Sequence, residues 1–209
     1  MTAERPCHGL RERKKQRTRL ALTDAALDLF LDQGYERTTI DEIVAAVEVS
    51  QRTFFRYFAT KEDVLTGFLA GYDRLMAAAL AARPPAERPF TALFEALRTV
   101  LSAIAEGAPD DAARFRRVRQ VFEATPALLP AQMARFSASE KALAAEIARR
   151  EGVDPERDLR PQIMVAFHSA ATRVAFEECA RNEVWDAATV AARIEDVVVL
   201  AGRTMGDWI

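Results

Sequence analysis

The stretch VEVSQRTFFRYFATKEDVL, residues 47–65, sets four aromatic rings among basic side chains. The rings are Phe54, Phe55, Tyr57 and Phe58, interleaved with Arg52 and Arg56 and followed by Lys61. A helix buried on all sides would not accommodate two arginines, because charged side chains are almost never fully buried. A fully solvated helix would not carry four rings. The stretch therefore predicts a short helix with one packing face and one exposed face.

The helical period assigns these side chains to the two faces. At 3.6 residues per turn, Phe54 and Phe58 share a face that can pack with Ile40, Ile43, Val44 and Val49. The opposite face carries Gln51, Arg52, Phe55 and Arg56, with Tyr57 near its edge. Long hydrogen-bonding side chains on an exposed short helix suit base edges in a major groove. An ordinary amphipathic helix with a solvated face is the alternative.

Start and stop signals place this helix inside a helix-turn-helix. Apolar spacing predicts a first helix over 11–33, ended by Gly34. Thr39 and Glu42 match a capping box that opens a second helix ending near Val47. Ser50 caps the third helix, residues 51–57, and Thr60 caps a fourth that starts at Lys61. Two short helices joined by a tight turn form the motif.

The remainder of the chain also has helical composition and spacing. Half of the 209 residues are hydrophobic, 8 are Gly, and no strand-like alternation is visible. Helices are expected at about 61–82, 89–105, 110–123, 127–150, 159–181 and 187–205. We therefore expect an all-α protein of about nine helices. The charged N-terminus lacks a signal core and no apolar run is long enough for a membrane span, which predicts a cytoplasmic protein without a membrane partner.

Basic residues gather before the first helix's apolar part. Six of the nine residues 11–19 are basic, including Lys14 and Arg17, although the whole chain has a net charge of −2. Such a flexible arm would add contacts to DNA phosphates or to the minor groove. A merely solubilising tail is the alternative.

The N-terminal pattern resembles the TetR family of transcriptional regulators. The resemblance covers TRLALTDAALDLFLDQGYERTTIDEIVAAVEVSQRTFFRYFATKEDVL. It implies a helix-turn-helix domain over 11–60, preceded by a disordered leader over 1–10. It also implies that one set of residues contacts double-stranded operator DNA, with Thr39, Tyr57 and Lys61 on phosphates. With Thr53 and with Lys14 and Arg17 of the basic arm, which the charge pattern adds, the full set of expected DNA contacts is Lys14, Arg17, Thr39, Gln51, Arg52, Thr53, Phe55, Arg56, Tyr57 and Lys61.

Two positions depart from the family's usual pattern. Glu48 stands in the turn where relatives have Gly, and a left-handed conformation there costs about 1 kcal/mol. Phe55 stands where relatives commonly have Tyr, so a phosphate hydrogen bond available to them is missing.

Within the expected ligand-binding and dimerisation domain, residues 61–209, the segments TPALLPAQM (residues 125–133) and ASEKALAAEIARREGVDPERDLRPQIMVAF (residues 138–167) resemble the C-terminal domain of a TetR subgroup related to the mycofactocin regulator MftR. The resemblance implies a helical domain that binds a small, mostly apolar effector and forms a homodimer. Expected pocket residues are Phe94, Phe115, Phe122, Phe167 and His168, although aromatic stripes at helical spacing also suit a plain core. Expected interface residues are Ala166, Ala170, Val174, Ile194, Val198 and Ala201, and these stripes suit a monomer's own core equally well.

The sequence has few of the motifs that catalysis requires. Its two histidines, His8 and His168, match no metal-binding spacing, and neither a phosphate loop nor a nucleophile elbow occurs. We therefore expect no enzyme activity, no metal and no cofactor. The expected function is a ligand-responsive regulator, by default a repressor. The alternative is a helical interaction module that docks its helix-turn-helix onto a protein.

Overall fold

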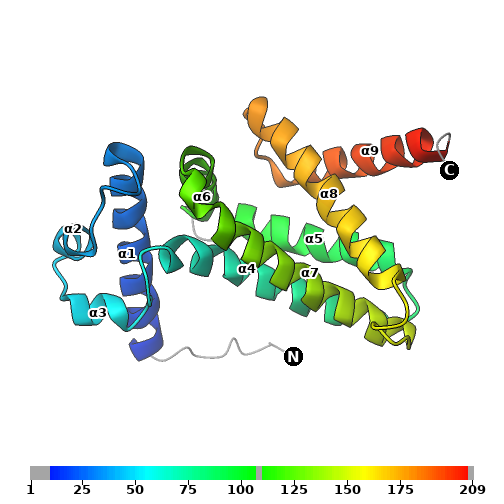
Figure 1. Ribbon diagram of the computed structural model, residues 1–209, viewed down its shortest axis with the longest axis horizontal. Coiled ribbons are helices and arrows are strands. Elements are labelled where there is room, and N and C mark those ends of the chain that lie inside the picture. Colours follow the sequence, from blue (N-terminus) through cyan, green and yellow to red (C-terminus); the bar gives the residue numbers. More distant parts are fainter. Residues whose placement is uncertain (1–9, 107–109, 207–209) are drawn as a thin grey trace, which may run out of the picture. The chain divides into compact units, whose positions relative to one another are not determined.

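The computed structural model describes residues 10–106 and 110–206, and Figure 1 shows that these residues form helices joined by short loops. The predicted all-α class is confirmed, with nine α-helices and one 3-10 turn in the described ranges. The elements are α1 Leu10–Gln33, α2 Ile40–Ala46, α3 Gln51–Phe55, α4 Asp63–Ala81, α5 Pro89–Glu106, α6 Asp111–Ala124, η1 Pro126–Leu128, α7 Leu129–Glu151, α8 Arg160–Arg181 and α9 Ala187–Gly206. The expected leader lies, except for its last residue Leu10, outside the described residues.

Local capping chemistry sets the bounds of the helix-turn-helix. The Thr39 hydroxyl accepts from the Glu42 N–H, and the Glu42 carboxylate accepts from the Thr39 N–H at 2.7 Å, which is the predicted capping box. Ser50 caps α3 by accepting from the Thr53 N–H at 3.2 Å. Gly34 ends α1 at a φ of 91°, the left-handed conformation that glycine tolerates.

The fourth helix begins two residues later than the sequence predicts. The Asp63 carboxylate accepts from the N–H groups of Ala59 and Thr60, at 2.9 and 3.0 Å, and the Thr60 hydroxyl accepts from the Asp63 N–H at 3.1 Å. These bonds hold residues 59–62 as a capping turn. The first helical residue is therefore Asp63, and Lys61 lies in the turn before it.

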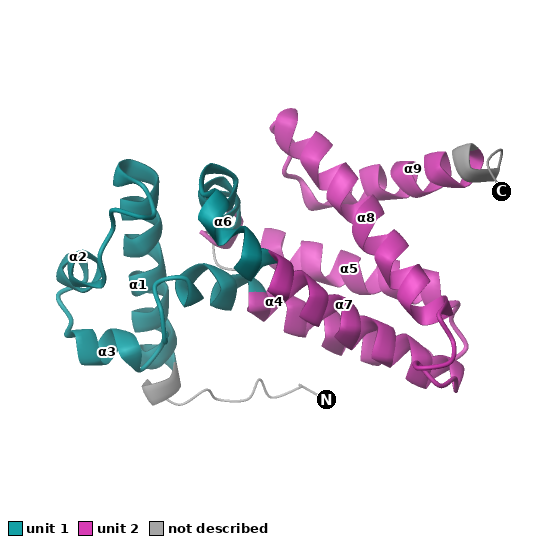
Figure 2. Cartoon of the chain, in the orientation of Figure 1, with its two compact units in different colours: residues 1–69, 113–132 teal, residues 70–112, 133–209 magenta. Residues whose placement is uncertain are grey.

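The chain divides into two compact units, which Figure 2 colours separately. Unit 1 comprises Met1–Leu69 and Ala113–Gln132, and unit 2 comprises Ala70–Ala112 and Met133–Ile209. Unit 1 thus holds α1 to α3, the start of α4, and nearly all of α6. Unit 1 extends beyond the helix-turn-helix because α6 packs its apolar face into the same core.

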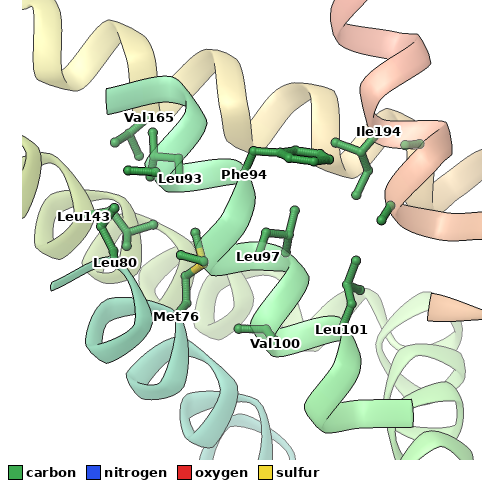
Figure 3. Close-up of a cluster of buried hydrophobic side chains, with 14 of the residues drawn as sticks. Met76, Leu80, Leu93, Phe94, Leu97, Val100, Leu101, Leu143, Val165 and Ile194 are labelled. Carbon is green, nitrogen blue, oxygen red and sulfur yellow. The ribbon is translucent and has the colours of Figure 1, made fainter. Parts of the chain in front are cut away.

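Each unit has its own apolar core. The core of unit 1 joins the helix-turn-helix to α6. Its members include Leu22, Leu27, Ile43, Phe54, Phe58, Leu65, Val118 and Phe122. The core of unit 2 is built around α5, whose Phe94 ring points toward Ile194 of α9 in Figure 3. Burial of these side chains at about 25 cal/mol per Å² of apolar surface is what stabilises helices as short as α3.

Helix α4 contributes to both cores. Its length and apolar composition alone would suit a membrane span. Its side chains Leu65, Met76 and Leu80 are buried, the first in the core of unit 1 and the others in that of unit 2. These three side chains thus tie α4 into the core of each unit.

Candidate nucleic-acid interface

The exposed face of α3 carries the side chains that the sequence predicts for base contacts. Gln51, Arg52, Phe55 and Arg56 are all exposed, and half of the Phe55 side chain, 51%, is accessible to solvent. Phe54 on the opposite face is fully buried. The described structure therefore places these four residues together on one exposed surface, as the helical period predicts.

Glu48 sits in the turn between α2 and α3 with a φ of 55°, in the left-handed region. The Glu48 N–H donates to the Ala45 carbonyl at 3.1 Å, and the Val49 N–H donates to the Val44 carbonyl at 3.0 Å. This is the hydrogen-bond pattern of a Schellman motif, which usually has glycine at the left-handed residue. The left-handed conformation expected at Glu48 is thus present, and the turn keeps both of its hydrogen bonds.

Polar neighbours hold several side chains on this surface. The Gln51 amide Nε2 donates to the Asp41 carboxylate of α2. The Arg56 guanidinium lies 5.0 Å from the Tyr57 ring centre and donates to the Tyr57 hydroxyl at 3.3 Å. Thr53 is half-buried, and its hydroxyl lies 3.1 Å from that of Ser50. Among the described contacts, none holds the Arg52 side chain in this way.

Two of the expected phosphate ligands are engaged within the protein. The Thr39 hydroxyl donates to the Glu42 carboxylate at 2.8 Å, so an anion already occupies the N-terminus of α2. The Lys61 ammonium donates to the carbonyls of Tyr35 and Thr38 at 2.6 and 2.7 Å, and it lies 4.3 Å from the Tyr35 ring centre. Burial lowers the pKa of Lys61. Lys61 therefore ties the loop after α1 to the turn before α4, which the sequence did not reveal.

The basic segment is helical, which corrects the expectation of a flexible arm. Lys14 and Arg17 are exposed side chains on the first half of α1. A groove of about 470 Å³ lies beside them, lined by Arg13, Gln16, Arg17, Leu20, Ala21, Asp24 and Arg114. The regular helix gives Lys14 and Arg17 fixed positions on unit 1.

Helix α6 is joined to α1 by ion pairs between distant parts of the chain. The Arg114 guanidinium, 6% exposed, donates to both Asp24 carboxylate oxygens at 2.6 and 2.8 Å. Arg117 donates to the Asp28 carboxylate one turn further along each helix. No local sequence pattern pairs Arg114 or Arg117 with α1, because the paired carboxylates lie about 90 residues away.

The residues expected to line one effector pocket are divided between two cores. Phe115 and Phe122 pack in the core of unit 1, whereas Phe94 belongs to that of unit 2. Phe167 and His168 lie on α8, where the Phe90 ring is 5.6 and 6.1 Å from theirs. The structure therefore does not bring the expected five residues together in one core. Helical spacing could not show this, because it identifies apolar faces and not their partners.

His168 is a buried polar group in unit 2. Its side chain is 5% exposed, and burial lowers its pKa to about 4. Its Nε2 atom has no hydrogen-bond partner, and the same holds for the Thr172 hydroxyl one turn along α8. Both atoms are unsatisfied in the described structure, which is costly in an apolar surrounding.

The expected interface residues also fall into two groups. Ala166, Ala170 and Val174 are exposed along one face of α8, next to Ile163, which is 63% exposed. Val198 and Ala201 of α9 are half-buried. Ile194 is fully buried in the core of unit 2, unlike the other five, which are exposed or half-buried. The exposed apolar residues of α9 are Val199 and Leu200 instead.

Comparison with known proteins gives matches along most of the chain. Residues 22–66 match the family described as "Bacterial regulatory proteins, tetR family", and residues 91–199 match the "MftR C-terminal domain". The HTH-type transcriptional regulator TcmR of Streptomyces glaucescens is 40% identical over 203 residues, which are 96% of this chain and 90% of TcmR. MftR of Mycobacterium tuberculosis is 26% identical over 182 residues, covering 82% of this chain and 84% of MftR.

The fold is shared with solved structures of low sequence identity. The complex of SmeT with triclosan has a TM-score of 0.61 at 17% identity and covers 88% of this chain and 91% of that chain. SmeT is the repressor of a multidrug efflux pump of Stenotrophomonas maltophilia.

Proposed function

Since this chain belongs to the TetR family of bacterial regulatory proteins and is a DNA-binding transcriptional regulator, we propose that it represses its target genes as an effector-released homodimer in the cytoplasm. The observation that carries the proposal is the exposed face of α3, where Gln51, Arg52, Phe55 and Arg56 stand on a buried Phe54. The family membership sets aside the alternative of a protein-interaction module, and it is a family of regulators rather than enzymes.

In this proposal α3 enters the major groove. Arg52 suits a guanine, to which a guanidinium can donate two hydrogen bonds, and Phe55 suits a thymine methyl group. The exposed cations Lys14 and Arg17 on α1 suit phosphates, which position the protein without reading sequence. Tyr57 and Thr53 at the edge of α3 are further contacts, whereas Thr39 and Lys61 support the fold of the motif.

Dimerisation is proposed through α8 and α9. One five-residue helix reads too few bases for useful specificity, and two copies on a palindromic site double the contacts. The apolar side chains that support this surface are exposed: Ile163, Ala166, Ala170 and Val174 on α8, and Val199 and Leu200 on α9. Two such helices from each protomer suit a four-helix bundle across a two-fold axis.

The effector site is proposed in unit 2, near α5 and α8. The Phe90 ring lies against Phe167 and the unsatisfied His168, and this apolar surround with one polar atom suits a mostly apolar molecule with a hydrogen-bonding group. Phe94 of the unit 2 core remains a further candidate. Helix α4 begins in unit 1 and ends in unit 2, about 28 Å away at 1.5 Å per residue, so it connects the two covalently. Effector binding would tilt α4 and change the spacing of two recognition helices. Reciprocal linkage then requires operator DNA to weaken effector binding by the same factor.

The test measures DNA binding by fluorescence anisotropy on a duplex selected by the wild-type protein and on a random duplex. Arg52→Ala should lower affinity for the selected duplex by about fivefold or more and have a smaller effect on the random one. Arg157→Ala is the matched control, because it removes the same charge from an 88% exposed side chain between α7 and α8. Equal effects of Arg52→Ala on both duplexes would contradict base reading by α3.

Dimerisation is tested separately by light scattering after size exclusion. Ile163→Glu changes a 63% exposed side chain and should convert the dimer to a monomer without disturbing the core. Met133→Glu, at 57% exposure on α7, is the control and should leave the dimer intact. A monomeric wild-type protein that binds one full operator would refute the proposed assembly.

A further inference from the structure

Gln51 is the first residue of α3, and Asp41 lies in the first turn of α2. The two side chains are ten residues apart in sequence, both exposed, and joined by the hydrogen bond from the Gln51 Nε2 to the Asp41 Oδ1. Asp41 takes no part in the capping box, which is formed by Thr39 and Glu42. The carboxylate of Asp41 is therefore directed at a base-contacting side chain and not at its own helix.

From this pair we infer that Asp41 is a positioning residue that sets which DNA base Gln51 reads, an inference that rests on the proposed function. A free glutamine amide can turn over and exchange its donor and acceptor ends. An ionised carboxylate only accepts hydrogen bonds, so it must face the amide nitrogen. Asp41 thus holds Nε2 on its own side and turns Oε1 away.

The held amide presents a defined edge to the DNA. One N–H of Nε2 is used by Asp41, which leaves Oε1 as an acceptor and the second N–H as a donor. This acceptor and donor pair matches adenine, whose major-groove edge offers the N6 amino donor beside the N7 acceptor. Guanine offers two acceptors, N7 and O6, and Oε1 would face O6 without a proton between them. The pair therefore favours adenine over guanine at one position of each half-site.

The negative charge of Asp41 also acts on all sequences alike. A carboxylate beside phosphates lowers affinity electrostatically, whatever the bases are. Asp41 thus weakens binding to random DNA while it sharpens the choice of one base. Loss of the Asp41 side chain should therefore raise the affinity for random DNA and lower the discrimination between bases. A purely structural residue would not produce this combination.

The experiment compares Asp41→Ala with Gln51→Ala, the double variant, and Glu48→Gln as the charge-matched control. Glu48 is exposed in the adjacent turn, and its carboxylate has no bond to Gln51. Each protein is presented with a pool of randomised double-stranded DNA at fixed salt. Affinities are then measured for the wild-type-selected duplex, for all single-base changes in it, and for a random duplex.

Both Asp41→Ala and Glu48→Gln should raise affinity for the random duplex. Only Asp41→Ala should lower discrimination, by about tenfold, and only at the adenine position that Gln51→Ala also relaxes. The double variant should discriminate no worse than Gln51→Ala alone, because the two side chains act as one unit. Relaxation at a different base pair would show that Asp41 reads that base itself and would overturn the inference. Unchanged discrimination in Asp41→Ala would overturn it as well.

A measurement without DNA separates this inference from the proposed function. In the free protein, the NMR signals of the Gln51 side-chain amide should show an ordered group that becomes mobile in Asp41→Ala but not in Glu48→Gln. A Gln51 amide that is equally mobile in all three proteins refutes the positioning role, regardless of the DNA affinities. If the amide is ordered but the wild type prefers no duplex over random DNA, the proposed function fails, and with it the inference.

Discussion

Replacement of Glu48 by glycine should stabilise the protein. Glu48 holds a φ of 55°, where the Cβ of an L-residue is crowded, at a cost of roughly 1–2 kcal/mol. Glycine has no Cβ and therefore relieves this crowding. Glycine also raises the conformational entropy of the unfolded chain, which reduces the gain in stability by roughly 0.5–1 kcal/mol. We expect a net gain of about 1 kcal/mol in the free energy of unfolding, which is a rise of about 2–4 °C in Tm for a chain of this size.

The chain contains two internal comparisons for this argument. Glu183 ends α8 with a φ of 56°, and its N–H donates to the Ala180 carbonyl at 3.2 Å, as in the turn at Glu48. Gly152 ends α7 in the same motif with a φ of 65°, and nothing lies within 4 Å of the place of a Cβ. Glu183→Gly should therefore gain about as much as Glu48→Gly. Gly152→Ala should lose about 1 kcal/mol through backbone strain alone.

The assay is urea unfolding followed by circular dichroism, with Glu48→Ala as a control that removes the charge and keeps the strained backbone. Glu48→Ala should gain little or nothing. If it stabilises as much as Glu48→Gly, the cause is the charge and the strain argument is refuted. DNA affinity should be alike in Glu48→Ala and Glu48→Gly, because relief of strain leaves the aim of α3 unchanged.

Three further predictions concern ionisable side chains that are buried or half-buried. Lys61→Met should lose about 1–3 kcal/mol of stability in urea unfolding, whereas Arg52→Ala should change it by less than about 0.5 kcal/mol. Arg114→Leu, compared with the control Arg119→Leu in the more exposed pair with Glu123, should lose about 2–3 kcal/mol, because it removes both short hydrogen bonds to Asp24 and leaves the longer 3.8 Å pair with Arg117. The buried His168 has a pKa of about 4, below the ordinary 6.5, so an unfolded chain takes up its proton first as the pH falls. Stability should drop by up to about 3 kcal/mol between pH 6.5 and 4, and His168→Gln should flatten that slope.

Capping residues made the recognition motif predictable from the sequence. Thr39, Glu42, Ser50 and Gly34 act on backbone groups within four residues of themselves, so their roles follow from sequence spacing alone. The exposed face of α3 follows equally from the helical period. The carbonyls that bind Lys61 lie more than twenty residues from it, and no local pattern indicates them. The division of the expected pocket between two cores has the same origin.

The pair of Arg114 and Asp24 shows what such a long-range contact adds to the mechanism. Periodicity predicts α6 as a helix, but not that it packs on α1 in unit 1. Arg114 is 90 residues from Asp24 and is nearly fully buried when bound to it, so separation of the pair would break two charge-assisted hydrogen bonds at a buried guanidinium. Any displacement of α6 must therefore either carry α1 with it or break this bond. Because α1 carries Lys14 and Arg17 and shares a core with α3, displacement of α1 would move the surface that is proposed to bind DNA.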